Sequence, residues 1–145
     1  MTNHASVECR PVAHITVAES ACRGAIVDAL QRRGWSVVEH ATGLHLIHAI
    51  SGVILGDQAT RLPGLIVADA AARGCSGLSI ARGLRDLGLQ VPVVAVARTP
   101  DELATAHGGV ITIARPENAA RVAESLAHQY ESRGDNPSPL QSATV

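Results

Sequence analysis

Aromatic residues are almost absent from this chain of 145 residues, which has one Trp, one Tyr and no Phe. Proteins that bind single-stranded nucleic acid usually stack the bases on aromatic side chains and follow the phosphate backbone with basic ones. Here the formal net charge is -1, and the 12 Lys and Arg residues form no basic block. We therefore expect no nucleic-acid partner, and a core built from Val, Ile, Leu and Ala.

The chain also lacks the features of a membrane or secreted protein. No apolar run approaches the roughly 18 residues that a membrane-spanning helix needs, and residues 1–10 have no basic start followed by an apolar stretch. The three cysteines, Cys9, Cys22 and Cys75, lie far apart, which fits reduced thiols better than a disulfide framework or a zinc cluster. We expect a cytoplasmic protein that does not contact a membrane.

What the chain does have is a regular alternation of short apolar runs and helical stretches. Runs rich in β-branched residues predict strands over 12–18, 35–39, 65–69, 91–97 and 110–114. Apolar residues at helical spacing predict helices over 19–33, 43–57 and 76–87, a short helix after Asp101 and a last helix from Pro116. Such alternation implies a parallel sheet with right-handed crossovers and helices on both faces.

Polar segments flank this pattern at both ends. The stretch 132–139 is rich in Ser, Gly, Asp, Asn and Pro, which favour turns and disorder. We therefore predict a flexible segment over 1–11, one domain over 12–132 and a disordered tail over 133–145.

Residues at the ends of the predicted strands suggest a family. Asp69 ends the third strand, a costly place for an unpaired carboxylate, and Gly77 follows at the eighth position. A turn and strand over 87–96 and the pair Arg115-Pro116 then follow in order. With these features the chain resembles the receiver domains of two-component response regulators over about residues 12–131. The resemblance implies a doubly wound (βα)5 sheet with strand order 2-1-3-4-5, and it places Asp69 at the phospho-acceptor position.

Several positions depart from the pattern of that family. The acidic pair that binds Mg²⁺ is reduced here to Glu19, so Glu19 and Asp69 offer only a weak Mg²⁺ site. Ala97 stands where a hydroxyl would bond to the phosphoryl group, and Arg115 replaces the lysine that pairs with it. The aromatic residue of the fifth strand maps to Thr112. Two interpretations of Asp69 are possible: it is a remnant of the phosphorylation site that now pairs with Arg115, or it still accepts a phosphoryl group. We favour the first.

The predicted second helix is apolar on nearly all sides. Leu46, Ile50 and Val53 form one apolar face, which the following segment 58–63 could cover. Exposed apolar patches otherwise mark interfaces. We therefore hypothesise that these three residues form part of a homodimer or partner surface.

Other residues that could carry chemistry are better explained as structural. His45 and His48 lie one helical turn apart and His40 is near them, but no Cys, Asp or Glu joins them at ligand spacing. Cys75 has no basic neighbour in the sequence that would activate its thiol.

We therefore expect a stand-alone signalling module of bacterial type, which binds a protein partner or a second copy of itself without the usual phosphorylation of Asp69. It would be no enzyme and would need no cofactor. Two alternatives stay open. One is a receiver that accepts phosphate on Asp69 with Mg²⁺, and the other is a flavodoxin-like module that binds a small ligand at the same strand ends.

Overall fold

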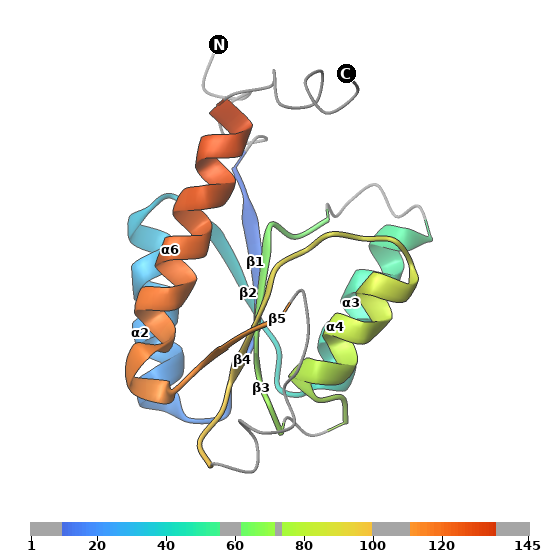
Figure 1. The fold of residues 1–145 in the computed structure, drawn as a ribbon, viewed down its shortest axis with the longest axis horizontal. Helices are drawn as coiled ribbons and strands as arrows, with labels where there is room; N and C mark the ends of the chain where they lie inside the picture. The colour runs from blue at the N-terminus through green and yellow to red at the C-terminus, as the bar shows by residue number, and fades with distance from the viewer. Residues whose placement is uncertain (1–9, 56–61, 72–73, 100–110, 136–145) are drawn as a thin grey trace.

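The computed structural model describes residues 10–55, 62–71, 74–99 and 111–135. This part of the chain contains five strands and four helices (Figure 1). Their bounds are β1 (Val12–Thr16), α2 (Ser20–Arg32), β2 (Ser36–Glu39), α3 (Gly43–Ile54), β3 (Leu65–Asp69), α4 (Gly77–Asp86), β4 (Val93–Val96), β5 (Ile111–Ala114) and α6 (Pro116–Asp135). The predicted elements are present with ends within a few residues of these bounds. The short helix predicted after Asp101 lies outside the described residues.

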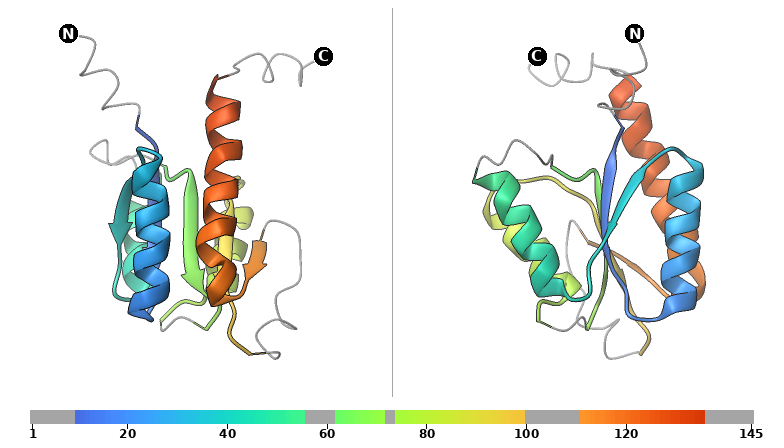
Figure 2. Two further views of the ribbon diagram at one scale, coloured as in Figure 1. Left: turned by 90° about the vertical axis from the view of Figure 1, so that its left-hand side faces the viewer. Right: turned by 180° about the vertical axis from the view of Figure 1, so that it is seen from behind.

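All neighbouring strands are parallel, and their order is β2-β1-β3-β4-β5. This confirms the predicted doubly wound sheet. β3 lies at the centre and every residue in it is buried, as its continuous apolar run predicts for a strand covered on both faces. The views in Figures 1 and 2 show α2 and α6 on one face of the sheet, and α3 and α4 on the other.

Side chains alternate across the sheet, so the protein has two apolar cores. Ile15 and Val67 face α2 and α6, whereas Ile66 and Ala68 face α3 and α4. The α6 residues that are buried in the first core are small and spaced four apart, namely Ala119, Ala123 and Ala127. Small side chains let this helix pack closely, which suits a core with few aromatic residues.

The last helix is longer than predicted. α6 continues through Asp135, so the turn expected from residue 132 is helical up to that point. Glu131 accepts hydrogen bonds from Arg33 and Trp35, and these contacts hold the last turns of α6 against the preceding structure. Of the predicted flexible segment 1–11 and the predicted tail 133–145, residues 1–9 and 136–145 lie outside the described residues.

The apolar face predicted as an interface on α3 faces inward for two of its three residues. Leu46 and Ile50 are 0% and 2% exposed and pack in the core against β3, so the interface prediction is wrong for them. Val53 is half-buried. The exposed large side chains of this region are instead Leu44 and Leu55. A helix that is apolar all round has no polar stripe, and its sequence therefore does not indicate which side faces the sheet.

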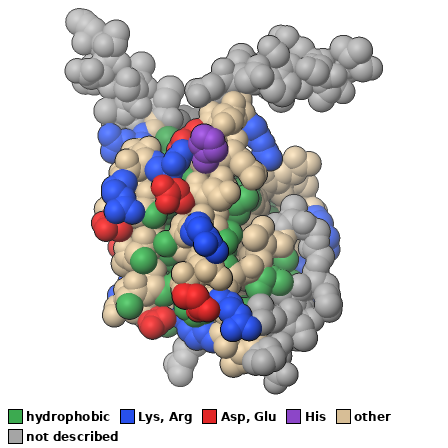
Figure 3. Space-filling view, turned by 60° about the vertical axis from the view of Figure 1, so that its left-hand side comes forward, with side chains coloured by type: hydrophobic (Ala, Val, Ile, Leu, Met, Phe, Trp, Pro, Cys, Tyr) green, Lys and Arg blue, Asp and Glu red, His purple; other side chains and the backbone are tan. Residues whose placement is uncertain are grey.

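The outer surface carries mixed charge. On the face shown in Figure 3, basic and acidic side chains are interspersed rather than gathered by sign. Among the described helices, none combines the length and the apolar character that crossing a membrane requires.

Candidate functional site

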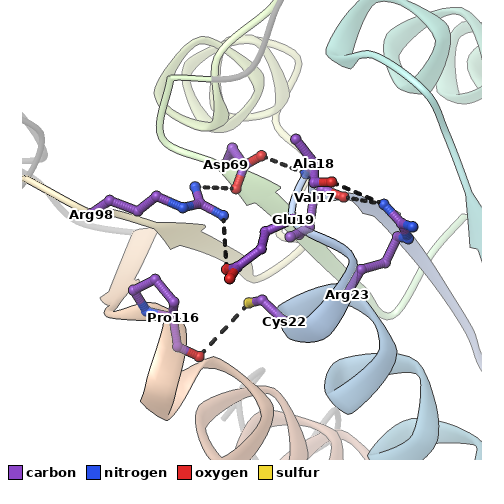
Figure 4. Close-up of polar contacts among 8 residues, drawn as sticks. All are labelled: Val17, Ala18, Glu19, Cys22, Arg23, Asp69, Arg98 and Pro116. Carbon is purple, nitrogen blue, oxygen red and sulfur yellow. Dashed lines mark hydrogen bonds and ion pairs between the residues drawn. The ribbon is translucent and has the colours of Figure 1, made fainter.

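Three charged residues gather where the carboxyl ends of the parallel strands meet (Figure 4). Asp69 is the last residue of β3, Glu19 precedes α2 and Arg98 follows β4. They line an open depression of about 530 Å³ together with Thr16, Ala18, Ala41 and Ala71. Ligands of doubly wound proteins usually bind at this edge of the sheet. This edge is therefore the candidate functional site.

The carboxylate of Asp69 is buried and engaged through both oxygens. The backbone N–H of Ala18 donates to Oδ2 at 2.8 Å, and Nη1 of Arg98 donates to Oδ1 at 2.9 Å. Asp69 is only 6% exposed, and a buried carboxylate without such partners would be strongly destabilising. Its neighbours therefore bind it as a structural anion.

Arg98 connects the two acids of the depression. Its Nη2 lies 3.7 Å from Oε1 of Glu19, while its Nη1 bonds to Asp69 (Figure 4). The hydrogen bond to Asp69 is the main cause that raises the pKa of Arg98 above its usual range. The depression thus contains a permanent positive charge between its carboxylates.

The predicted pairing of Asp69 with Arg115 is wrong. Arg115 follows β5 and is exposed, and it forms no ion pair within the part of the chain that the structure describes. Arg98 occupies the position beside Oδ1 of Asp69 instead, with its Nη1 2.9 Å from that oxygen. Arg98 follows the strand adjacent to Asp69 and reaches it directly. Its place after the fourth predicted strand was the signal that could have found it.

Other residues at this edge add little chemistry. Ala97 is fully buried and offers a ligand no hydroxyl, as predicted from its side chain, and Thr112 is exposed on β5.

Cys22 lies close to the depression, with its Sγ 3.7 Å from the carbonyl oxygen of Pro116. Burial raises the pKa of the Cys22 thiol, although Arg98 acts in the opposite direction. Burial also raises the pKa of Cys75, so both thiols are poor nucleophiles at neutral pH.

The residues of the depression do not fit a magnesium ion. Mg²⁺ requires a nearly octahedral shell of oxygen atoms and favours sites with free carboxylate oxygens. Both oxygens of Asp69 are engaged, and the guanidinium of Arg98 lies between Asp69 and Glu19. Within the described residues, no three or more His, Cys, Asp or Glu side chains are placed to hold a metal ion.

A second polar cluster joins two histidines, His14 of β1 and His40, which follows β2. Nδ1 of His14 lies 2.8 Å from Nε2 of His40, and the two rings are nearly parallel. Burial lowers the pKa of His14 to about 4, and burial followed by the charge of His45 lowers the pKa of His40. Both rings are therefore neutral at pH 7, with one N–H donated to the other ring. We predicted no role for His14, because it lies inside a predicted strand. His45 and His48 are exposed.

Comparison with known proteins identifies the fold. No family model matches the chain, and no curated protein matches it in sequence. Solved structures do match. The phosphorylated cyanobacterial phytochrome response regulator RcpA superposes with a TM-score of 0.63 at 17% identity, over 86% of this chain and 96% of that one. A response regulator receiver domain protein from Bacillus halodurans superposes with a TM-score of 0.61 at 12% identity, over 83% and 97%.

A DNA-binding response regulator of the LuxR family from Staphylococcus aureus also matches, with a TM-score of 0.61 at 14% identity over 83% of this chain and 98% of that one. The chain therefore has a flavodoxin-like, doubly wound α/β fold. Within that class, its fold is that of response regulator receiver domains.

Proposed function

We propose that this chain is a receiver-fold signalling module that acts through protein contacts and does not use phosphorylation of Asp69. The observation that carries the proposal is the bond between Arg98 and Asp69. A phospho-acceptor attacks phosphorus with a lone pair of a carboxylate oxygen, and each charge-assisted hydrogen bond that the oxygen accepts stabilises the anion and makes it a weaker nucleophile. Here one oxygen is bound by a guanidinium and the other by a backbone N–H.

The groups that would stabilise a transferring phosphoryl group are also reduced in number. Phosphoryl transfer depends almost entirely on positioning and on neutralising the developing negative charge. Among the described residues, Glu19 is the one further acid that lines the depression, and it already faces Arg98. Ala97 supplies no hydroxyl at the end of β4. These features favour a module whose state does not depend on phosphate.

Arg98 supplies positive charge at the place where a receiver would hold a metal ion, but it does so permanently. A guanidinium keeps its proton at any physiological pH, and its geometry matches carboxylates. The edge formed by β1, β3 and β4 is therefore held in one arrangement by contacts within the chain. We infer that binding of a protein partner, or of a second copy, changes the state of the module.

Intact-mass spectrometry after incubation with acetyl phosphate and Mg²⁺ tests the proposal. A working receiver domain serves as the positive control, and Asp69→Asn as the negative one. We expect no phosphoryl adduct on the wild-type chain. An adduct that disappears in Asp69→Asn would make the chain a phospho-accepting receiver and would refute the proposal.

The phospho-accepting function is the second candidate, and one observation favours it. Asp69 and Glu19 share the depression, so removal of Arg98 would leave two acids facing the same space. The wild-type result separates the two candidates, and Arg98→Ala in the same assay tests whether Arg98 is the cause. An adduct on Arg98→Ala but not on the wild type would identify Arg98 as the group that blocks the chemistry. Light scattering of the wild type over a range of concentrations tests self-association.

A further inference from the structure

A second pocket lies at the opposite edge of the sheet from Asp69. It forms where residues 88–92, which lead from α4 into β4, pass the C-terminal part of α6. In Figure 1 this end of α6 points away from the edge where β3 ends. The pocket has a volume of about 410 Å³, within the range of pockets that bind small molecules.

The pocket has an apolar wall and a basic rim. Leu89, Pro92, Leu126 and the ring of Tyr130 supply the apolar surface. Arg85 of α4 and Arg133 of α6 lie at the rim and are exposed. Among the residues that the structure describes, no Asp or Glu lines this pocket.

Neither arginine is neutralised by a neighbour in the described part of the chain. Their side chains take part in none of its ion pairs or side-chain hydrogen bonds, whereas Arg33 and Arg98 are both paired. Each lies in the last turn of its helix, where a cation is favourable. That location explains why each arginine is tolerated, but not why the described lining of the pocket carries two positive charges and no acid.

We propose that this pocket binds a small amphipathic anion, a carboxylate attached to a short apolar chain. Guanidinium groups bind carboxylates through paired charge-assisted hydrogen bonds. The apolar wall would remove the chain of the ligand from water, and the two arginines would bind its head group. This site is separate from the depression at Asp69, so the proposal does not rest on the function proposed above.

The fluorescence of Trp35 can report ligand binding in this pocket. The ring of Tyr130 packs edge-on against Trp35, with centroids 5.3 Å apart. Trp35 is the single tryptophan of the chain and is 2% exposed, and its indole N–H donates to Glu131 at 2.7 Å. A ligand that contacts Tyr130 would change the surroundings of Trp35, which fluorescence detects.

The test uses three probes with the same chain and different head groups: octanoate, 1-octanol and octylammonium. Trp35 fluorescence is titrated with each probe, and backbone amide NMR spectra locate the binding site. We expect saturable binding of octanoate about tenfold tighter than that of octanol, as expected for one added charge-assisted contact. Amide shifts should fall on Leu89, Leu126 and Tyr130, and not on Asp69 or Ala18.

Variants then test the arginines. Arg85→Gln and Arg133→Gln should each weaken octanoate binding several-fold and should leave octanol binding unchanged. Arg82→Gln serves as the matched control, because Arg82 is exposed on α4 but does not line the pocket. Circular dichroism checks that each variant is folded. Absence of saturation at millimolar octanoate, equal binding of the three probes, unchanged binding by both variants, or shifts at the Asp69 edge would each overturn the proposal.

Discussion

Acidification should destabilise this fold through the buried histidine pair. His14 is 5% exposed, and burial lowers its pKa to about 4. An unfolded chain has a histidine pKa near 6.5. Between these values the unfolded state binds a proton that the folded state does not, so stability decreases as the pH falls from about 6.5 to about 4.

The size of the effect follows from the two pKa values. The linkage relation gives a loss of about 2 kcal/mol at pH 5 relative to pH 8, rising to about 3 kcal/mol below pH 4. His40 acts in the same direction, because its pKa is also lowered. A loss of this size is a large part of the stability of a typical domain.

Urea unfolding between pH 5 and pH 8, followed by Trp35 fluorescence and circular dichroism, measures the effect. Carboxylates also titrate near the lower end of this range, so the informative quantity is the difference between two proteins. In His14→Gln, which cannot titrate but can still bond to His40, the loss of stability between pH 8 and pH 5 should be smaller by about 2 kcal/mol. His48→Gln, at an exposed position, should keep the wild-type dependence. Parallel pH profiles of His14→Gln and the wild type would refute this reasoning.

Three further substitutions test contacts that hold the fold. Arg98→Gln leaves the buried Asp69 without its cation and should lower the free energy of unfolding by about 1–2 kcal/mol. In an Asp69→Asn background the same substitution should lower it by a smaller amount. Glu131→Ala removes the acceptor of the buried Trp35 N–H and should cost about 1–3 kcal/mol and shift the Trp35 emission. Ile50→Ala should cost about 2–5 kcal/mol, because Ile50 lies in the core. Denaturant unfolding measures all three.

Exposed residues of the same chain supply the controls. Arg115→Gln should change stability far less than Arg98→Gln, because Arg115 is exposed and does not pair with Asp69. Leu44→Ala, at a position 60% exposed, should likewise cost much less than Ile50→Ala. Equal effects within either pair would contradict the packing described above.

Much of the architecture follows from local patterns in the sequence. The alternation of short β-branched runs with helical stretches predicts a parallel sheet covered on both faces. The continuous apolar run before Asp69 predicts that β3 is central, and Asp69 itself marks the edge where the charged residues gather. These features depend on residues near one another in the chain, so periodicity and composition are enough to predict them.

The tertiary structure decides which distant residues meet. It pairs Asp69 with Arg98 rather than Arg115, and it brings His14 to His40. It also turns Leu46 inward on a helix whose sequence is apolar on every side. Each of these outcomes depends on strand order and on the rotation of a helix against the sheet. Contacts between segments far apart in the chain determine both, and no short stretch of sequence contains that information.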